Sequence, residues 1–223
     1  MPFRRAHAPE DFLRGDDLTR AMSGIGMRFA TKATPHANIE DTLIAASTEG
    51  MERDDLRVLS ILVTWIEAHH PWINADRLTR ALGVGSSGRV LAFWAAIAAW
   101  LHQDRRFSRI ALLHKEGRVD LLRAGTEFHL ARHGEDRRFE GTCLRVPADI
   151  LRDRKGDVLT PAALAKRHRT YRQRAQMGPS YRADMWAELE ADPTLTPAKL
   201  ARRTYGSFAT AWQVRKDFAL LAA

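Results

Sequence analysis

The chain has 223 residues, of which 45% are hydrophobic and 28% are charged. These values are typical of a globular protein with one or two domains. Its longest apolar run, residues 90–101, is shorter than the ~20 residues that a membrane-spanning helix needs. The single cysteine, Cys143, excludes an intramolecular disulfide, and the N-terminus has no secretion pattern. We therefore expect a cytoplasmic protein that does not contact a membrane.

The net charge of +8 is concentrated in the last third of the chain. Residues 151–223 hold 14 Lys and Arg against 7 Asp and Glu, whereas the first 150 residues are nearly balanced. An excess of this kind favours a polyanionic partner. The sequence therefore predicts a basic C-terminal region that binds nucleic acid.

Residues 1–50 are predicted to form an N-terminal arm followed by helices. The better marked helix begins after Asn38, a residue suited to capping it, and Glu40 and Asp41 favour the positive end of its dipole. We expect this helix to end at Gly50.

Residues 51–151 are predicted to form a winged-helix-like domain. Helices are expected at 53–68, at 75–82 after the cap Asn74, and at 90–101, followed by a β-hairpin of residues 110–113 and 118–122. Further strands at 128–131 and 142–146 would extend this small sheet. The third helix has no polar face with which to read bases, so we expect it to lie in the core or, alternatively, to contact a second subunit.

No segment has the pattern of a catalytic or cofactor site. The loop GVGSSG at 83–88 has the spacing of a dinucleotide-binding turn, but the residues before it have helical rather than strand periodicity. His129 and His133 are four residues apart but lack further metal ligands nearby. We therefore predict that the protein has no cofactor, no metal and no enzymatic activity, although activity without a known motif stays open.

Residues 152–223 are predicted to form a basic domain that contains a repeat. LTPAALAKR at 159–167 and LTPAKLARR at 195–203 agree at seven of nine positions. In both copies Thr can cap a helix and Pro occupies the first helical position. We interpret the two copies as similarly capped helices, with coincidence as the alternative.

The second copy begins a pair of short helices, 197–205 and 208–220. We expect Gly206 to take the left-handed conformation that ends the first helix and Ser207 to cap the second. Phe208, Ala211, Trp212 and Phe218 are predicted to face inward. The stretch, supported by a helix at 180–191, resembles the helix-turn-helix of DNA-binding regulators, a likeness at the level of the superfold that covers roughly 40 residues.

This resemblance implies that one face of the second helix enters a groove of duplex DNA. The expected base contacts are Thr210, Gln213, Arg215 and Lys216. An unbalanced basic run lies upstream in what we expect to be one continuous helix, and it suits backbone phosphates. The expected phosphate contacts are Lys166, Arg167, Arg169, Arg172, Arg174, Arg202, Arg203 and Ser207.

The sequence thus predicts a mainly α-helical protein with a winged-helix-like region, a small β-hairpin or sheet, and a C-terminal helix-turn-helix. The predicted function is transcriptional regulation through double-stranded DNA. Two alternatives remain open: an antitoxin or defence-system component that binds a protein partner or forms a homodimer, and an RNA-binding factor. The segments predicted as domains are 1–50, 51–151 and 152–223.

Overall fold

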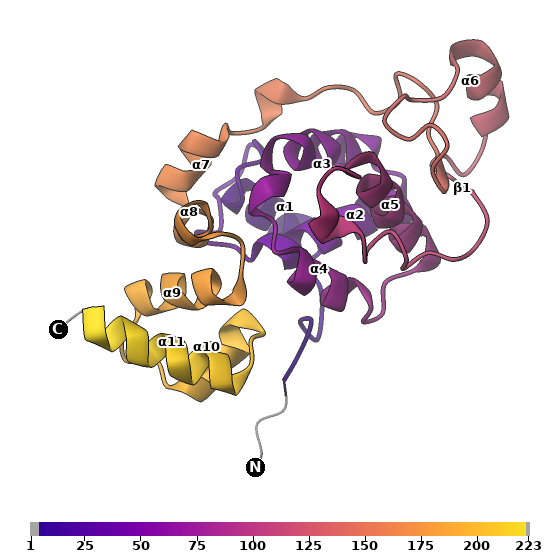
Figure 1. Cartoon of the computed structure of the whole chain (residues 1–223). Helices are drawn as coiled ribbons and strands as arrows, with labels where there is room; N and C mark the ends of the chain where they lie inside the picture. Colours follow the sequence, from indigo (N-terminus) through magenta and orange to yellow (C-terminus); the bar gives the residue numbers. More distant parts are fainter. Residues whose placement is uncertain (1–4, 222–223) are drawn as a thin grey trace.

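The computed structural model describes residues 5–221 and is mainly α-helical (Figure 1). Its α-helices are α1 (Gly15–Gly24), α2 (Ile39–Arg53), α3 (Leu56–His69), α4 (Ala75–Leu82), α5 (Gly88–Trp100), α6 (Thr126–His133), α7 (Pro161–Arg167), α8 (Arg169–Met177), α9 (Tyr181–Ala191), α10 (Pro197–Thr204) and α11 (Phe208–Leu221). Short 3-10 helices are η1 (His70–Trp72), η2 (Arg105–Phe107) and η3 (Lys155–Asp157). Within the described range, no helix is both long and apolar enough to cross a membrane.

Helices α2, α3 and α5 form the centre of a large N-terminal body. Two tryptophans on α3 and α5 are completely buried there, and each satisfies its indole N–H. Trp65 donates to the carbonyl of Ile25 at 2.8 Å, and Trp94 donates to Oγ of Ser47 at 2.9 Å. The apolar helix predicted at 90–101 is therefore a core helix. Burial of its tryptophan costs little free energy because the indole N–H is hydrogen-bonded.

Helix α2 does not end at Gly50, as the sequence analysis expected, but continues to Arg53. Gly50 is buried inside the helix, where a Cβ atom would lie 2.3 Å from Cγ of Leu59 on α3. The glycine is thus needed for the close approach of two helices rather than for a stop. The left-handed residue that ends α2 is Asp54, with φ of 56°.

The predicted β-hairpin is wrong. Strand β1 (Val119–Asp120) pairs in parallel with β2 (Leu144–Arg145), and residues 110–113 form turns in which Ile110 is buried. Residues 128–131, predicted as a strand, lie in α6. A parallel pair needs a long connection, and the segment that contains α6 supplies it. The structure therefore has a two-stranded parallel sheet in place of a wing.

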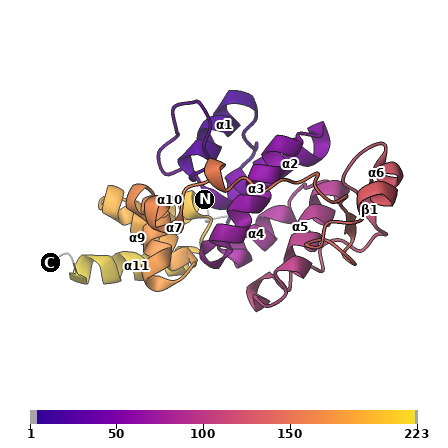
Figure 2. The same cartoon turned by 90° about the horizontal axis from the view of Figure 1, so that it is seen from above.

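Helices α9, α10 and α11 form a C-terminal module with a separate small core. Met185, Leu189, Leu200, Ala211 and Val214 are among its buried residues. Figures 1 and 2 both place this module at one end of the molecule and α6 at the other.

The two cores do not divide the chain at the predicted domain boundaries. The core of the body extends from Leu18 on α1 to Leu164 on α7 and Tyr171 on α8. Helices α1 and α2 therefore contribute to the core of the body, and the chain passes from one core to the other between α8 and α9.

Candidate nucleic-acid interface

The C-terminal module has the local features that the sequence predicts for its helices. Ser180 caps α9, Thr196 caps α10 and Ser207 caps the first turn of α11, each by accepting a backbone N–H three residues ahead at 3.0–3.3 Å. In the repeat upstream, Thr160 caps α7 in the same way. The two copies of the repeat are thus both capped helix starts.

The turn between α10 and α11 differs from the prediction in one residue. Tyr205, with φ of 56°, takes the left-handed conformation expected of Gly206. Gly206 is instead fixed by packing, because a Cβ at this position would lie 2.1 Å from Cε of Met185 on α9. The Tyr205 carbonyl accepts a hydrogen bond from Nε of Arg5 at 2.9 Å.

Helix α11 is rotated relative to the predicted orientation. Ala211 and Val214 are its buried residues, and the Phe218 ring contacts Trp186 of α9 at 5.1 Å between centroids. Phe208 and Trp212, expected inside, are 43% and 53% exposed. Ala211, Val214 and Phe218 are spaced so that they lie on the same face of the helix, and this face points inward. Val214 therefore lies in the core, and the larger Trp212 lies outside it.

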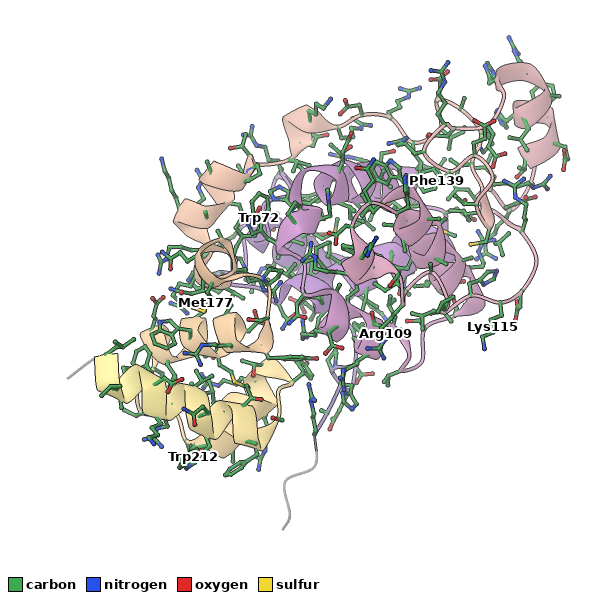
Figure 3. The ribbon with its side chains drawn as sticks, in the orientation of Figure 1. Trp72, Arg109, Lys115, Phe139, Met177 and Trp212 are labelled. Carbon is green, nitrogen blue, oxygen red and sulfur yellow. The ribbon has the colours of Figure 1, made fainter. Side chains whose placement is uncertain are left out.

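This rotation defines the exposed face of α11. Trp212, Gln213 and Lys216 share it, and Nζ of Lys216 lies 5.8 Å from the centroid of the Trp212 ring. Gln213 donates to Oδ1 of Asp217 at 2.8 Å. Thr210 and Arg215, also predicted as base contacts, are half-buried at the edges, and Thr210 shares a 2.7 Å hydrogen bond with Ser207. Figure 3 shows Trp212 projecting from the free side of the module.

The basic run at 166–174 does not form one surface. The helix is interrupted at His168. Lys166 and Arg167 are therefore the last residues of α7, where they are exposed, and the later arginines belong to α8. Arg169 is half-buried, and Arg172 binds Glu190 at 2.9 Å. On α10, Arg202 and Arg203 are exposed, and Arg203 lies 3.2 Å from Glu188.

Arg174 is not a phosphate contact in this structure, because it is only 2% exposed. Its guanidinium binds Glu40 of α2 at 2.6 Å and Asp184 of α9 at 2.7 Å. A buried charge is costly unless it is paired, and here both ends of the guanidinium have carboxylate partners. The residue therefore joins the body to the C-terminal module.

Glu40 is the centre of this buried ionic cluster. Arg77 of α4 binds it at 2.7 Å and also binds Asp41 at 2.7 Å. Burial alone would raise the pKa of Glu40, but Arg174 and Arg77 lower it to about 2. The Arg77 guanidinium also lies 4.5 Å from the centroid of the Tyr205 ring, so the cluster reaches the turn before α11. Sequence reasoning assigned Glu40 only to the helix dipole, since partners over 30 residues away leave no local pattern.

Two buried histidines fix α7 and α8 to the rest of the body. His69 contacts the Tyr171 hydroxyl at 2.7 Å and the Leu159 carbonyl at 3.0 Å. His168 contacts the Ala37 carbonyl at 2.9 Å, and its other ring nitrogen accepts the Tyr171 N–H at 3.2 Å. Burial lowers the pKa of both histidines to about 4.

Among residues 5–221 the potential metal ligands do not gather at one place. No group of three or more potential ligands occurs among residues 5–221. His129 and His133 lie one turn apart on α6, where a strand was expected, with ring centroids 6.4 Å apart. The GVGSSG loop follows helix α4 rather than a strand, as the helical periodicity of the residues before it predicted.

No known protein family, curated protein or solved structure matches this chain.

Proposed function

We propose that the protein binds double-stranded DNA through the exposed face of α11 and acts as a transcriptional regulator. The observation that carries the proposal is the position of Gln213 and Lys216 on a face of α11 that no other element within residues 5–221 covers, on a helix positioned by α9 and α10. A glutamine amide can bond adenine at two atoms, and lysine can bond guanine or a phosphate. Thr210 and Arg215 would contribute from the two edges of this face.

Phosphate contacts would come from cations of the C-terminal module and of α7 and α8, together with the Ser207 hydroxyl. Arg202 and Arg203 lie on α10, and Ser207 lies at the N-terminus of α11, the end of a helix that favours anions. Lys166 and Arg167 at the end of α7 would add charge, with Arg169 and Arg172 supporting them. Arg174 is no longer part of this set.

A protein partner is the second candidate, and the exposed aromatic residue on α11 favours it. Trp212 is half-exposed, and Leu220 and Leu221 farther along the helix are 77% and 75% exposed. Tryptophan is frequent at the centres of protein interfaces. An antitoxin or defence-system component, or a homodimer, would use the same face for such a contact.

The test is selection of bound fragments from genomic DNA at physiological salt, with structured RNA as competitor. Enrichment of one short duplex region, undiminished by the RNA, is the result expected of a regulator. Retention of RNA in place of duplex DNA would support an RNA-binding factor instead. Binding of neither nucleic acid above the level of a neutral control protein would contradict the proposal and favour a protein partner.

A further inference from the structure

A cavity of about 250 Å³ lies at the N-terminus of α4, on the border between the body and the C-terminal module. Asn74, Asp76, Arg106 and Arg109 of the body line it, and Pro179, just before α9, lines it from the module side. None of these residues belongs to the face of α11. The cavity is therefore separate from the proposed base-reading surface.

Asn74, which lines this cavity, has an unsatisfied side-chain donor. Its side-chain oxygen accepts the N–H of Arg77 at 3.2 Å, which fixes the orientation of the amide. The residue is only 2% exposed, and its Nδ2 has no hydrogen-bond partner in the described part of the chain. A buried donor without an acceptor costs free energy, so a ligand with an acceptor oxygen here would remove that cost.

The surroundings favour an anionic acceptor. Arg109 is 70% exposed and lies 3.6 Å from Asp76, and Arg80 binds the same carboxylate at 3.0 Å. Arg106 is held rigidly, because it donates to the carbonyls of Ile73 and His70 at 3.2 Å each and to Asp104. Three guanidinium groups thus lie around the cavity, and the three nearby carboxylates, Asp76, Asp104 and Glu40, all have arginine partners.

The first turn of α4 adds to this positive potential. The amides that begin a helix have no partners within it and point outward, toward the end at which an anion is stabilised. α4 is eight residues long, and its first amides belong to Ala75 and Asp76 beside the cavity.

We infer that this cavity binds a phosphate group, with Asn74 Nδ2 and the Arg109 guanidinium as donors and Arg106 as a fixed cationic wall. The phosphate could belong to the backbone of duplex DNA or to a free phosphate compound.

The direct test is titration of the ¹⁵N-labelled protein with inorganic phosphate, read from the side-chain amide resonances of Asn74, against sodium chloride at equal ionic strength. A saturable shift with phosphate alone is expected. Arg109→Ala should weaken phosphate binding about tenfold, because it removes a charge-assisted hydrogen bond. Arg105→Ala is the matched control, since Arg105 is exposed, removes the same charge and does not line the cavity.

Asn74 itself is tested by a replacement that keeps the helix cap. Ser is a good capping residue, so Asn74→Ser should retain the folded helix while it removes the amide donor. Phosphate binding, followed by calorimetry, should weaken severalfold in this variant. Equal affinity in Asn74→Ser, in Arg109→Ala and in the parent would overturn the assignment, as would a chloride titration with the same shift.

Duplex binding identifies the source of the phosphate. If a DNA backbone phosphate fills the cavity, Arg109→Ala should lower the slope of log K against log salt by about 0.9, and Arg105→Ala should not. An unchanged slope together with saturable inorganic phosphate binding would identify a free phosphate compound. The phosphate titration needs no DNA, so failure of the proposed function and failure of this site are separate results.

Discussion

Arg172 and Arg174 lie two residues apart on α8, yet their surroundings differ completely. The Arg172 side chain is 43% exposed and binds one carboxylate, that of Glu190. Arg174 is enclosed between two carboxylates of different elements, and although burial opposes its ionisation, Asp184 and Glu40 raise its pKa above the usual range. The like-charged arginines that are close together in the sequence are thus separated in the structure, with Arg172 at the surface and Arg174 in the interior.

This difference gives a prediction for stability. Arg174→Met should lower the free energy of unfolding by about 3–5 kcal/mol, because it leaves Asp184 and part of Glu40 buried without a counter-charge. Arg172→Met, the control on the same helix, should cost about 1 kcal/mol or less, since exposed ion pairs contribute little. Urea unfolding of both variants measures the difference. Equal losses would contradict the assignment of Arg174 to a buried cluster.

At the scale of the element, helix caps and apolar runs were predictable, and packing contacts were not. Asn38, Asn74 and Thr196 cap the helices that the sequence assigned to them, because a cap is a local hydrogen bond. Gly50 and Gly206 were both read as helix ends. At each position a side chain of another helix leaves no room for a Cβ atom. Such contacts between helices cannot be predicted from the local sequence.

Glycine replacements test this account of α2. Gly50→Ala should destabilise the protein by about 1–3 kcal/mol, because overpacking against Leu59 outweighs the higher helix propensity of alanine. Gly88→Ala, in the first turn of α5, meets only a glutamate oxygen at 3.8 Å and should be neutral or stabilising by up to ~1 kcal/mol. Thermal unfolding of the two variants separates these effects. A stabilised Gly50→Ala protein would show that α2 and α3 are farther apart.

Long-range pairing explains the remaining errors in the fold. The segment at 118–122 has strand character, but its partner is residues 144–145 rather than 110–113, and nothing local distinguishes the two choices. The rotation of α11 was missed because Trp212 seemed a better core residue than Val214. Which face of α11 is buried depends on the side chains of α9 that pack against it, and the periodicity of α11 alone does not contain this information.

At the scale of the whole molecule, ionic and histidine contacts hold the parts together. Arg174 of the body binds Asp184 of the C-terminal module, and His69 and His168 fix α7 and α8 to the rest of the body. These contacts set the position of α11 relative to the body. The ionic and histidine contacts also make the stability of the folded chain dependent on pH.

The two histidines predict a loss of stability in mild acid. Their folded-state pKa of about 4 lies below the ordinary value of 6.5, so the unfolded chain binds protons first. The contribution of the two histidines to the free energy of unfolding is fully present above pH 6.5. Between pH 6.5 and 4 the free energy of unfolding should fall by about 1.4 kcal/mol per pH unit for each histidine. Glu40, whose pKa of about 2 lies below the ordinary 4.5, adds its loss only below pH 4.5.

Replacement of one histidine checks the slope. His168→Asn keeps a residue suited to capping α8 and should remove about half of the slope between pH 6 and 4.5, measured by urea unfolding at a series of pH values. His102→Asn, at an exposed position, should leave the slope as it is. An equal slope in all three proteins would mean that His168 is not buried as a neutral ring.

The central claim is that α11 reads duplex DNA, and Gln213 tests it most directly. On the short duplex recovered from genomic selection, Gln213→Ala should lower affinity by about 1–3 kcal/mol at fixed salt, with the thermal midpoint and non-specific binding nearly unchanged. Gln176→Ala, an exposed glutamine at the end of α8, is the matched control and should bind like the parent. Equal affinity of the Gln213→Ala and Gln176→Ala proteins for that duplex would contradict the account.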